Sequence, residues 1–187
     1  MDSHKLETEI KLRAPSAGEA KTLLEQHGFA VSRPRAFEAN ELFDFREGGL
    51  RQRREILRLR EYAGQSVVTY KGPPIAGRHK SREELETKVD DGQTLRAVFS
   101  RLGLKPTFRY EKYRTEWTRG SEPGHATLDE TPIGVFLELE GPPGWIDQTA
   151  SLLGFQAGDY ITASYGKLYE EFCNKNGIAP SHMTFDG

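Results

Sequence analysis

The sequence predicts an α+β protein, a single domain in which antiparallel strands close into a β-barrel with a charged lumen and helices pack outside. In several stretches charged residues stand at every second position and apolar residues occupy positions between them. Segments with helical spacing of apolar residues separate these stretches. Because side chains of a strand alternate between two faces, each such strand has one charged and one apolar face. The alternating stretches are residues 7–11, 58–60, 82–88, 112–116 and 138–140.

The first half of the chain is predicted to hold one helix followed by strands. Ser16 with Glu19 three residues later forms a capping box, and Gly28 follows the last apolar residue at helical spacing. Gly72-Pro73-Pro74 ends the strand-like run. The predicted elements are a helix over 16–27 and strands within 37–45 and 50–71, with turns at 47–49 and 63–65.

The second half loosely repeats this order. Asp90-Asp91-Gly92 precedes a helical pattern that Gly103 closes, and Gly141-Pro142-Pro143-Gly144 is a strong break before two further helical patterns. The predicted elements are a strand over 78–89, a helix up to 102, a strand over 107–119, a hairpin of 126–131 and 134–140, helices around 146–153 and 165–172, and an aperiodic tail from 176.

Composition narrows the class of protein. The 187 residues suffice for one domain with a real core, and 26 basic against 28 acidic residues give a net charge of −2. This balance argues against nucleic-acid binding through a uniformly basic surface, because affinity for phosphate backbones needs a basic excess. No apolar run approaches the roughly 20 residues that span a bilayer, and the N-terminus lacks a secretory signal, so we expect a cytoplasmic protein. The single Cys173 has no cysteine with which to form an internal disulfide.

The strand registers agree on which charged residues face inward. If Glu7, Glu9 and Lys11 point into the barrel, the other strands place comparable numbers of acidic and basic groups beside them. The predicted inward carboxylates are Glu7, Glu9, Glu84, Glu86, Asp129, Glu138 and Glu140. The predicted inward cations are Lys11, Arg58, Arg60, Lys71, Arg82, Lys112 and Arg114. Neither set can be buried alone.

This combination of charges has a chemical interpretation. Clustered carboxylates repel one another unless a hard cation such as Mg²⁺ or Mn²⁺ lies among them. Lysine and arginine at separate positions along the lumen would hold a chain of phosphoryl groups. A triphosphate with bound metal satisfies both requirements, which indicates phosphoryl-transfer chemistry.

A simpler interpretation holds for each stretch alone. A single Glu-x-Glu-x-Lys strand is usually the solvated face of a sheet, and paired basic residues are usually surface charges. The joint occurrence of five such stretches in one consistent register favours the charged lumen. The five histidines show no metal-ligand spacing, and residues 164–168 are more typical of a helix packing face, from which Lys167 could reach the lumen.

Several motifs together resemble one known family. Glu7-Thr8-Glu9-Ile10-Lys11 resembles the N-terminal signature of the CYTH family, the triphosphate tunnel metalloenzymes. Successive strand motifs resemble this family in order: 57–60, 69–73, 82–86, 112–114, 128–130 and 138–141. The resemblance implies an eight-stranded tunnel domain over residues 4–173, followed by a tail over 174–187.

The resemblance also implies roles for the charged residues. It implies divalent metal, Mg²⁺ or Mn²⁺, held chiefly by Glu7, Glu9, Glu138 and Glu140, with help from Asp129 and Glu84 or Glu86. It implies triphosphate held by Lys11, Arg58, Arg60, Lys71, Lys112 and Arg114, with Arg82 and Lys167 as further candidates. Lys11, Glu138 and Glu140 are the candidate catalytic residues, Lys11 by polarising the phosphoryl group.

The family divides by what attacks the triphosphate. Hydrolases direct water to the terminal phosphoryl group, whereas class IV adenylate cyclases direct the ribose 3′ hydroxyl to the α-phosphate and release pyrophosphate. No adenine-reading motif is found, so we favour hydrolysis of inorganic, thiamine or nucleoside triphosphate over the cyclase. A non-catalytic polyphosphate-binding module would have the same charges, and a carrier of apolar ligands would need an apolar lumen. A homodimer is compatible with the sequence.

Overall fold

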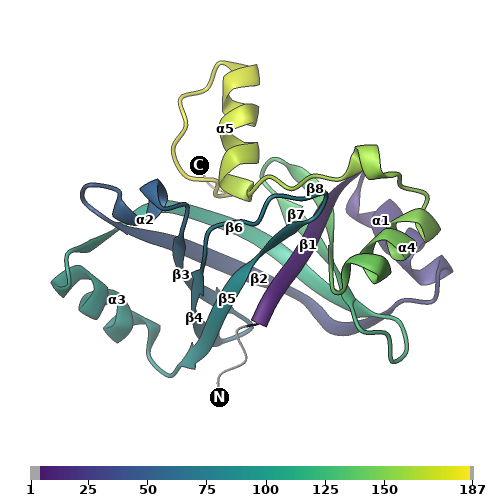
Figure 1. Cartoon of the computed structure of the whole chain (residues 1–187), viewed down its shortest axis with the longest axis horizontal. Coiled ribbons are helices and arrows are strands. Elements are labelled where there is room, and N and C mark those ends of the chain that lie inside the picture. Colours follow the sequence, from purple (N-terminus) through teal and green to yellow (C-terminus); the bar gives the residue numbers. More distant parts are fainter. Residues whose placement is uncertain (1–4, 186–187) are drawn as a thin grey trace.

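Residues 5–185, which the computed structural model describes, form a closed barrel of eight antiparallel strands (Figure 1). Around the barrel the order is β1, β5, β4, β3, β2, β6, β7, β8, and β8 pairs with β1. The predicted fold class is therefore confirmed. The strands are β1 Lys5–Ala14, β2 Ala30–Phe45, β3 Ile56–Tyr62, β4 Gln65–Lys71, β5 Lys80–Val89, β6 Leu104–Thr118, β7 His125–Thr131 and β8 Gly134–Glu140.

The helices lie outside this barrel. In Figure 1, α1 and α4 are side by side at one end, α3 lies at the other end, and α5 stands above the strands. Ser16 caps α1 as predicted, because its hydroxyl accepts a hydrogen bond from the backbone N–H of Glu19 at 3.1 Å. The helices are α1 Ala17–Gln26, α2 Gly49–Gln52, α3 Gly92–Arg101, α4 Pro143–Leu152, a 3₁₀ turn Ala157–Asp159, and α5 Tyr165–Asn176. Among the described residues, no helix is long and apolar enough to cross a membrane.

Two strand boundaries differ most from the prediction. Residues 50–52, predicted as the start of a strand, belong to α2 instead, because the Asp44 carboxylate accepts hydrogen bonds from the backbone N–H groups of Leu50 and Arg51 and stabilises a helical turn. The second strand begins at Ala30, seven residues before the predicted start at Phe37. This extension has few buried side chains and exists because it pairs with the end of β6, which alternation along the chain alone does not reveal.

The apolar faces of the strands pack against the helices. Ile10 and Leu12 of β1 are fully buried in the largest core cluster, together with Leu24 of α1 and Ile146 of α4. A second cluster lies between β2, β3 and α3, where Phe43 meets Phe99 at a ring-centroid distance of 5.1 Å. These contacts leave the opposite faces of the same strands for the lumen.

One part of the lumen is apolar, which corrects the expectation of a uniformly charged interior. Phe136 lies directly across from Asp129 in the β7–β8 register and so shares its inward face. It packs against Tyr165 of α5 and joins a cluster with Tyr110 and Met183. The chain beyond α5 therefore contributes to closing one side of the barrel.

The segment after α5 is also paired. The backbone N–H of Met183 donates to the carbonyl of Arg109 at 3.0 Å, and the N–H of Glu111 donates to the carbonyl of Met183 at 2.9 Å. This part of β6 precedes its pairing with β7, which starts at Tyr113. The predicted tail thus covers a free strand edge.

Candidate functional site

The structure brings nearly all of the predicted inward charges into one lumen. Cross-strand partners in the registers fall on the same face, so Lys11 lies beside Glu138, Arg114 beside Asp129, and Lys71 beside Glu84. Charged residues on the lumen face include Glu7, Glu9 and Lys11 of β1, Glu38 of β2, Arg58 and Arg60 of β3, Lys71 of β4, Lys80, Arg82, Glu84 and Glu86 of β5, Lys112 and Arg114 of β6, Asp129 of β7, and Glu138 and Glu140 of β8.

Lys11 joins two carboxylates at the centre of the site. Its Nζ lies 3.0 Å from Glu9 Oε1 and 3.1 Å from Glu138 Oε1, and its side chain is 3% exposed. Burial alone would lower the pKa of Lys11, but Glu138 and Glu9 outweigh burial and raise it well above its usual value. Lys11 is therefore a permanent cation in this arrangement, suited to stabilising negative charge and unsuited to accepting a proton.

Asp129 organises a second cluster. It accepts hydrogen bonds from Lys112 at 2.7 Å, from Arg114 through both of its oxygens, and from the Tyr165 hydroxyl at 2.7 Å. Arg114 also pairs with Glu138, so the two clusters are continuous. With both oxygens engaged, Asp129 chiefly positions Lys112 and Arg114 in this structure.

A third cluster lies between β1, β4 and β5. Lys71 Nζ is 2.6 Å from Glu7 Oε2 and 3.0 Å from Glu84 Oε2. Burial and the neighbouring Glu9 raise the pKa of Glu7 to about 7. Burial is the larger of these two causes, so a cation that binds beside the Glu7 carboxyl would favour its charged form.

The arginines have donors that the protein does not use. Among the described residues, no hydrogen-bond partner is found for the buried Nε of Arg58, Nε of Arg60, or Nε and one terminal nitrogen of Arg82. Arg82 is 6% exposed, and burial lowers its pKa. Leaving guanidinium N–H groups unpaired in a buried site is costly, so these donors indicate a site for an anion with several oxygens.

Two predicted residues lie nearer the surface than the central clusters. Glu140 is half-buried at the end of β8, directly across from Glu9 of β1, and the His125 imidazole lies 3.7 Å from its carboxylate. Lys167 lies on the exposed side of α5, with its side chain 56% exposed and paired with Glu170 at 3.4 Å. Lys167 therefore does not reach the lumen in this structure.

Three residues of the lumen were missed by the sequence analysis. Glu38 is fully buried, with Lys112 at 3.4 Å, and Lys80 reaches Glu9 at 2.5 Å. Tyr165 enters from α5. Lys80 continues the inward alternation of Arg82 and Glu84, a signal that could have identified it. Glu38 lies in a strand with no clean alternation of charge, and Tyr165 sits on a helix, so neither had such a signal.

The donor set of the lumen fits a hard divalent cation. Glu7, Glu9 and Glu138 supply carboxylate oxygens, which Mg²⁺ and Mn²⁺ prefer, and the shared contact with Lys11 shows that a positive charge fits between Glu9 and Glu138. Within residues 5–185 the acidic side chains do not converge as a ready-made group of three ligands, because lysines and arginines stand between them. Metal binding would therefore replace some of these ion pairs.

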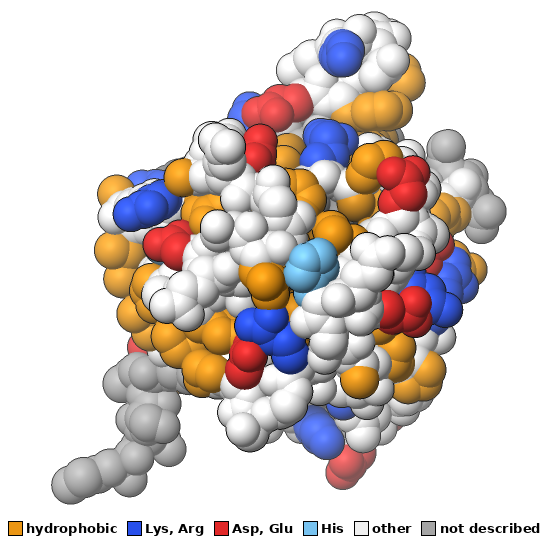
Figure 2. Space-filling model, turned by 90° about the vertical axis from the view of Figure 1, so that its right-hand side faces the viewer, with side chains coloured by type: hydrophobic (Ala, Val, Ile, Leu, Met, Phe, Trp, Pro, Cys, Tyr) orange, Lys and Arg blue, Asp and Glu red, His pale blue; other side chains and the backbone are white. Residues whose placement is uncertain are grey.

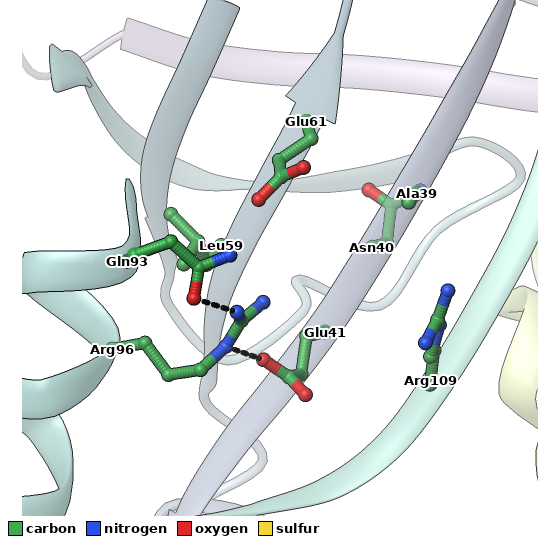
Figure 3. Close-up of a pocket in the computed structure, with 8 residues that line it drawn as sticks. All are labelled: Ala39, Asn40, Glu41, Leu59, Glu61, Gln93, Arg96 and Arg109. Atoms are coloured by element: carbon green, nitrogen blue, oxygen red, sulfur yellow. Dashed lines mark hydrogen bonds and ion pairs between the residues drawn. The ribbon is translucent and has the colours of Figure 1, made fainter. Parts of the chain in front are cut away.

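Surface features outside the barrel are weaker candidates. A cavity of about 190 Å³ lies between α3 and the outer faces of β2, β3 and β6 (Figure 3). In it Arg96 bonds Glu41 at 2.6 Å and Gln93 at 2.8 Å, so its charged groups satisfy one another. On the face shown in Figure 2, Lys and Arg side chains are scattered among acidic and apolar ones without a continuous basic patch. Among the described residues, the buried guanidinium groups with unpaired donors lie in the lumen.

Comparisons with known proteins agree with this geometry. The family model described as CYTH domain matches residues 5–153. A Methanocaldococcus jannaschii protein provisionally named an adenylate cyclase is 33% identical over 136 residues, which cover 72% of this chain and 76% of that protein.

Solved structures show the same fold. A provisionally named adenylate cyclase from Vibrio parahaemolyticus superposes with a TM-score of 0.79 at 20% identity, covering 90% of this chain and 99% of that one. A provisionally named adenylyl cyclase from Hippeastrum, described as having a dominant triphosphatase activity, gives a TM-score of 0.61 at 20% identity, covering 94% and 97%. Because the family model matches most of its length and a relative is 33% identical over 72% of it, this chain belongs to the CYTH domain family.

Proposed function

We propose that the protein is a divalent-metal-dependent triphosphatase that hydrolyses the terminal phosphoanhydride of a triphosphate substrate inside the barrel. The observation that carries this proposal is the set of buried guanidinium donors without partners on Arg58, Arg60 and Arg82. They face carboxylates across one lumen, so an anion and a cation can bind side by side. A triphosphate with its metal has both charges.

The basic residues of the lumen would bind the phosphoryl groups, and the acidic residues would bind the metal ion. Lys71, Arg58, Arg60 and Arg82 lie along β3, β4 and β5 and would hold successive phosphoryl groups. Lys11 would stabilise charge that develops on the transferred group, because it stays protonated. A divalent cation held by Glu7, Glu9 and Glu138 would supply charge neutralisation and orientation of the phosphate oxygens.

A second candidate function is the cyclisation of ATP to cyclic AMP and pyrophosphate. It is favoured by the Methanocaldococcus jannaschii relative, which carries the cyclase name and is 33% identical. The same cations would serve, with the substrate placed so that the α-phosphate meets the ribose hydroxyl. Against it, the lumen aromatics Phe136, Tyr110 and Tyr165 pack on one another, and no open stacking surface for adenine is evident among them.

Product analysis separates these functions. Purified protein is incubated with tripolyphosphate, thiamine triphosphate and ATP in turn, each with Mg²⁺ or Mn²⁺, and orthophosphate, pyrophosphate and cyclic AMP are resolved. We expect orthophosphate that disappears when the metal is chelated. Cyclic AMP with equimolar pyrophosphate from ATP would establish the cyclase instead, and no product from any substrate would leave a binding module.

A pair of variants tests the arginine site. Arg58→Gln removes a lumen guanidinium, whereas Arg101→Gln removes one from the exposed side of α3. The proposal requires KM for the active substrate to rise at least tenfold in the first variant only. Equal kinetics of both variants would contradict it.

A further inference from the structure

Lys80 places a buried ammonium group directly on a candidate metal-binding carboxylate. Its Nζ lies 2.5 Å from Glu9 Oε1, and the two side chains are 11% and 9% exposed. The same oxygen accepts the hydrogen bond from Lys11 at 3.0 Å. One carboxylate oxygen of Glu9 thus contacts two lysines. In this arrangement the Lys80 ammonium balances the negative charge of Glu9.

The backbone near Lys80 is fixed from outside the barrel. The preceding residue, His79, lies 2.8 Å through Nε2 from Asp147 Oδ1 of α4, and the Tyr160 hydroxyl donates to the same oxygen at 3.1 Å. On the other side, the N–H of Ile75 donates to the carbonyl of Ser81 at 2.8 Å. The main chain is therefore held in place while the four-carbon side chain of Lys80 can rotate.

A divalent cation and the Lys80 ammonium cannot share this oxygen. At contact distance their like charges repel strongly in a buried site, so a metal ion that binds Glu9 must displace Lys80. The displaced ammonium stays in the lumen near Lys11, Lys71 and Arg82, which are also cationic. An anion brought in with the metal is then its best partner.

Resting on the function proposed above, we propose that Lys80 occupies the cation position on Glu9 before metal arrives and then becomes a phosphoryl-binding residue. Metal binding would thus release a ligand for the triphosphate. Lys80 would have opposite effects on the two affinities: it lowers the affinity for the metal ion, with which it competes, and raises the affinity for the triphosphate. A purely structural lysine would not have these opposite effects.

The experiment compares Lys80→Met with wild type in two binding measurements. Mn²⁺ affinity without substrate is read from the electron paramagnetic resonance signal of free Mn²⁺. Affinity for imidotriphosphate, a triphosphate whose bridging nitrogens resist hydrolysis, is measured by calorimetry at saturating Mn²⁺. We expect Lys80→Met to bind Mn²⁺ several-fold more tightly and imidotriphosphate about tenfold more weakly, the usual effect of losing one charged hydrogen bond.

Controls keep the result interpretable. Lys80→Arg retains the charge and should restore most of the imidotriphosphate affinity, while Lys21→Met on the exposed side of α1 should change neither affinity. Lys80→Gln replaces Lys80→Met if circular dichroism shows that the methionine variant is unfolded.

The outcomes separate this inference from the proposed function. Both affinities falling together in Lys80→Met, or both staying unchanged, would overturn the role of Lys80. If wild type binds Mn²⁺ and imidotriphosphate but releases no product from any triphosphate, hydrolysis is rejected and the opposite shifts in Lys80→Met still support Lys80 as a phosphoryl ligand. If wild type binds neither, both proposals are rejected.

Discussion

The Tyr165 hydroxyl donates a 2.7 Å hydrogen bond to Asp129 Oδ2, which ties the first turn of α5 to the charged lumen. Lys11 and Lys112 also lie 5.2 Å and 5.0 Å from the centre of the Tyr165 ring. A residue outside the strands therefore contacts both charged clusters, and the position of α5 is coupled to the arrangement of the site.

Tyr165→Phe should destabilise the fold by about 1 kcal/mol, because it removes one buried hydrogen bond while Lys112 and Arg114 still satisfy Asp129. Chemical denaturation measures this change. Tyr113→Phe is the matched control, since among residues 5–185 the Tyr113 ring packs against Phe37 and no hydrogen bond of its hydroxyl is found. A larger loss in the control would contradict the importance of the Tyr165 bond.

Glu138→Gln should reduce turnover at least a hundredfold and leave the protein folded. The amide keeps the shape of the side chain but removes the charge that faces Lys11 and Arg114 and that could hold a metal ion. Steady-state kinetics and circular dichroism give the two readouts. Glu171→Gln on the exposed side of α5 is the control and should match wild type. Full activity of Glu138→Gln would remove Glu138 from the catalytic residues.

Glu38 should contribute stability that depends on pH. Burial alone would raise its pKa, but Lys112 and Arg114 outweigh burial and lower the pKa from 4.5 to about 2. A depressed pKa in the folded state gives stability that is fully present above pH 4.5 and is lost as the pH falls toward 2. Wild type should therefore exceed Glu38→Gln in free energy of unfolding by up to roughly 3 kcal/mol at neutral pH.

Urea denaturation of both proteins between pH 2 and pH 7 checks this prediction. The other carboxylates titrate in both proteins, so the difference between the two curves isolates Glu38. That difference should shrink steadily below pH 4.5. A difference that grows on acidification would show that the pKa of Glu38 is raised instead.

Gly124→Ala should destabilise the protein by about 1–3 kcal/mol through overpacking. A Cβ atom at Gly124 would lie within 2.5 Å of carbon atoms of the Trp145 ring. That ring is buried, and its Nε1 donates to Glu122 at 2.7 Å. Gly144→Ala is the matched control in α4, because its added Cβ would point into open space. In thermal unfolding, we expect a lower midpoint temperature than wild type for Gly124→Ala and not for Gly144→Ala. Equal midpoint temperatures of the two variants would show that Trp145 can move aside.

Much of the site was predictable because strand geometry is simple. The alternation of Glu7, Glu9 and Lys11 with buried Ile10 and Leu12 determines which side chains share a face, whatever the partner strands are. The predicted inward charges of β3, β5, β6 and β8 follow the same rule, and the structure places nearly all of them together.

The partners of these charges could not be predicted in this way. Arg114 bonds both Asp129 and Glu138, whereas Arg82 has two buried nitrogens without a partner. These differences depend on strand order and stagger, which pair residues far apart in sequence. The extension of β2 and the paired segment at Met183 likewise exist because strand edges elsewhere are free.

The sequence by itself determined which side chains share a face of each element. Each strand has a charged face and an apolar face because its side chains alternate with a period of two, and each helix has one apolar stripe that packs on the outside of the barrel. Only the tertiary structure decided which charges meet and which remain unpaired, and that Glu38, Lys80 and Tyr165 join them. The physical reason is that the electrostatics of a buried group depend on distances of a few ångströms, which barrel closure sets and local sequence does not.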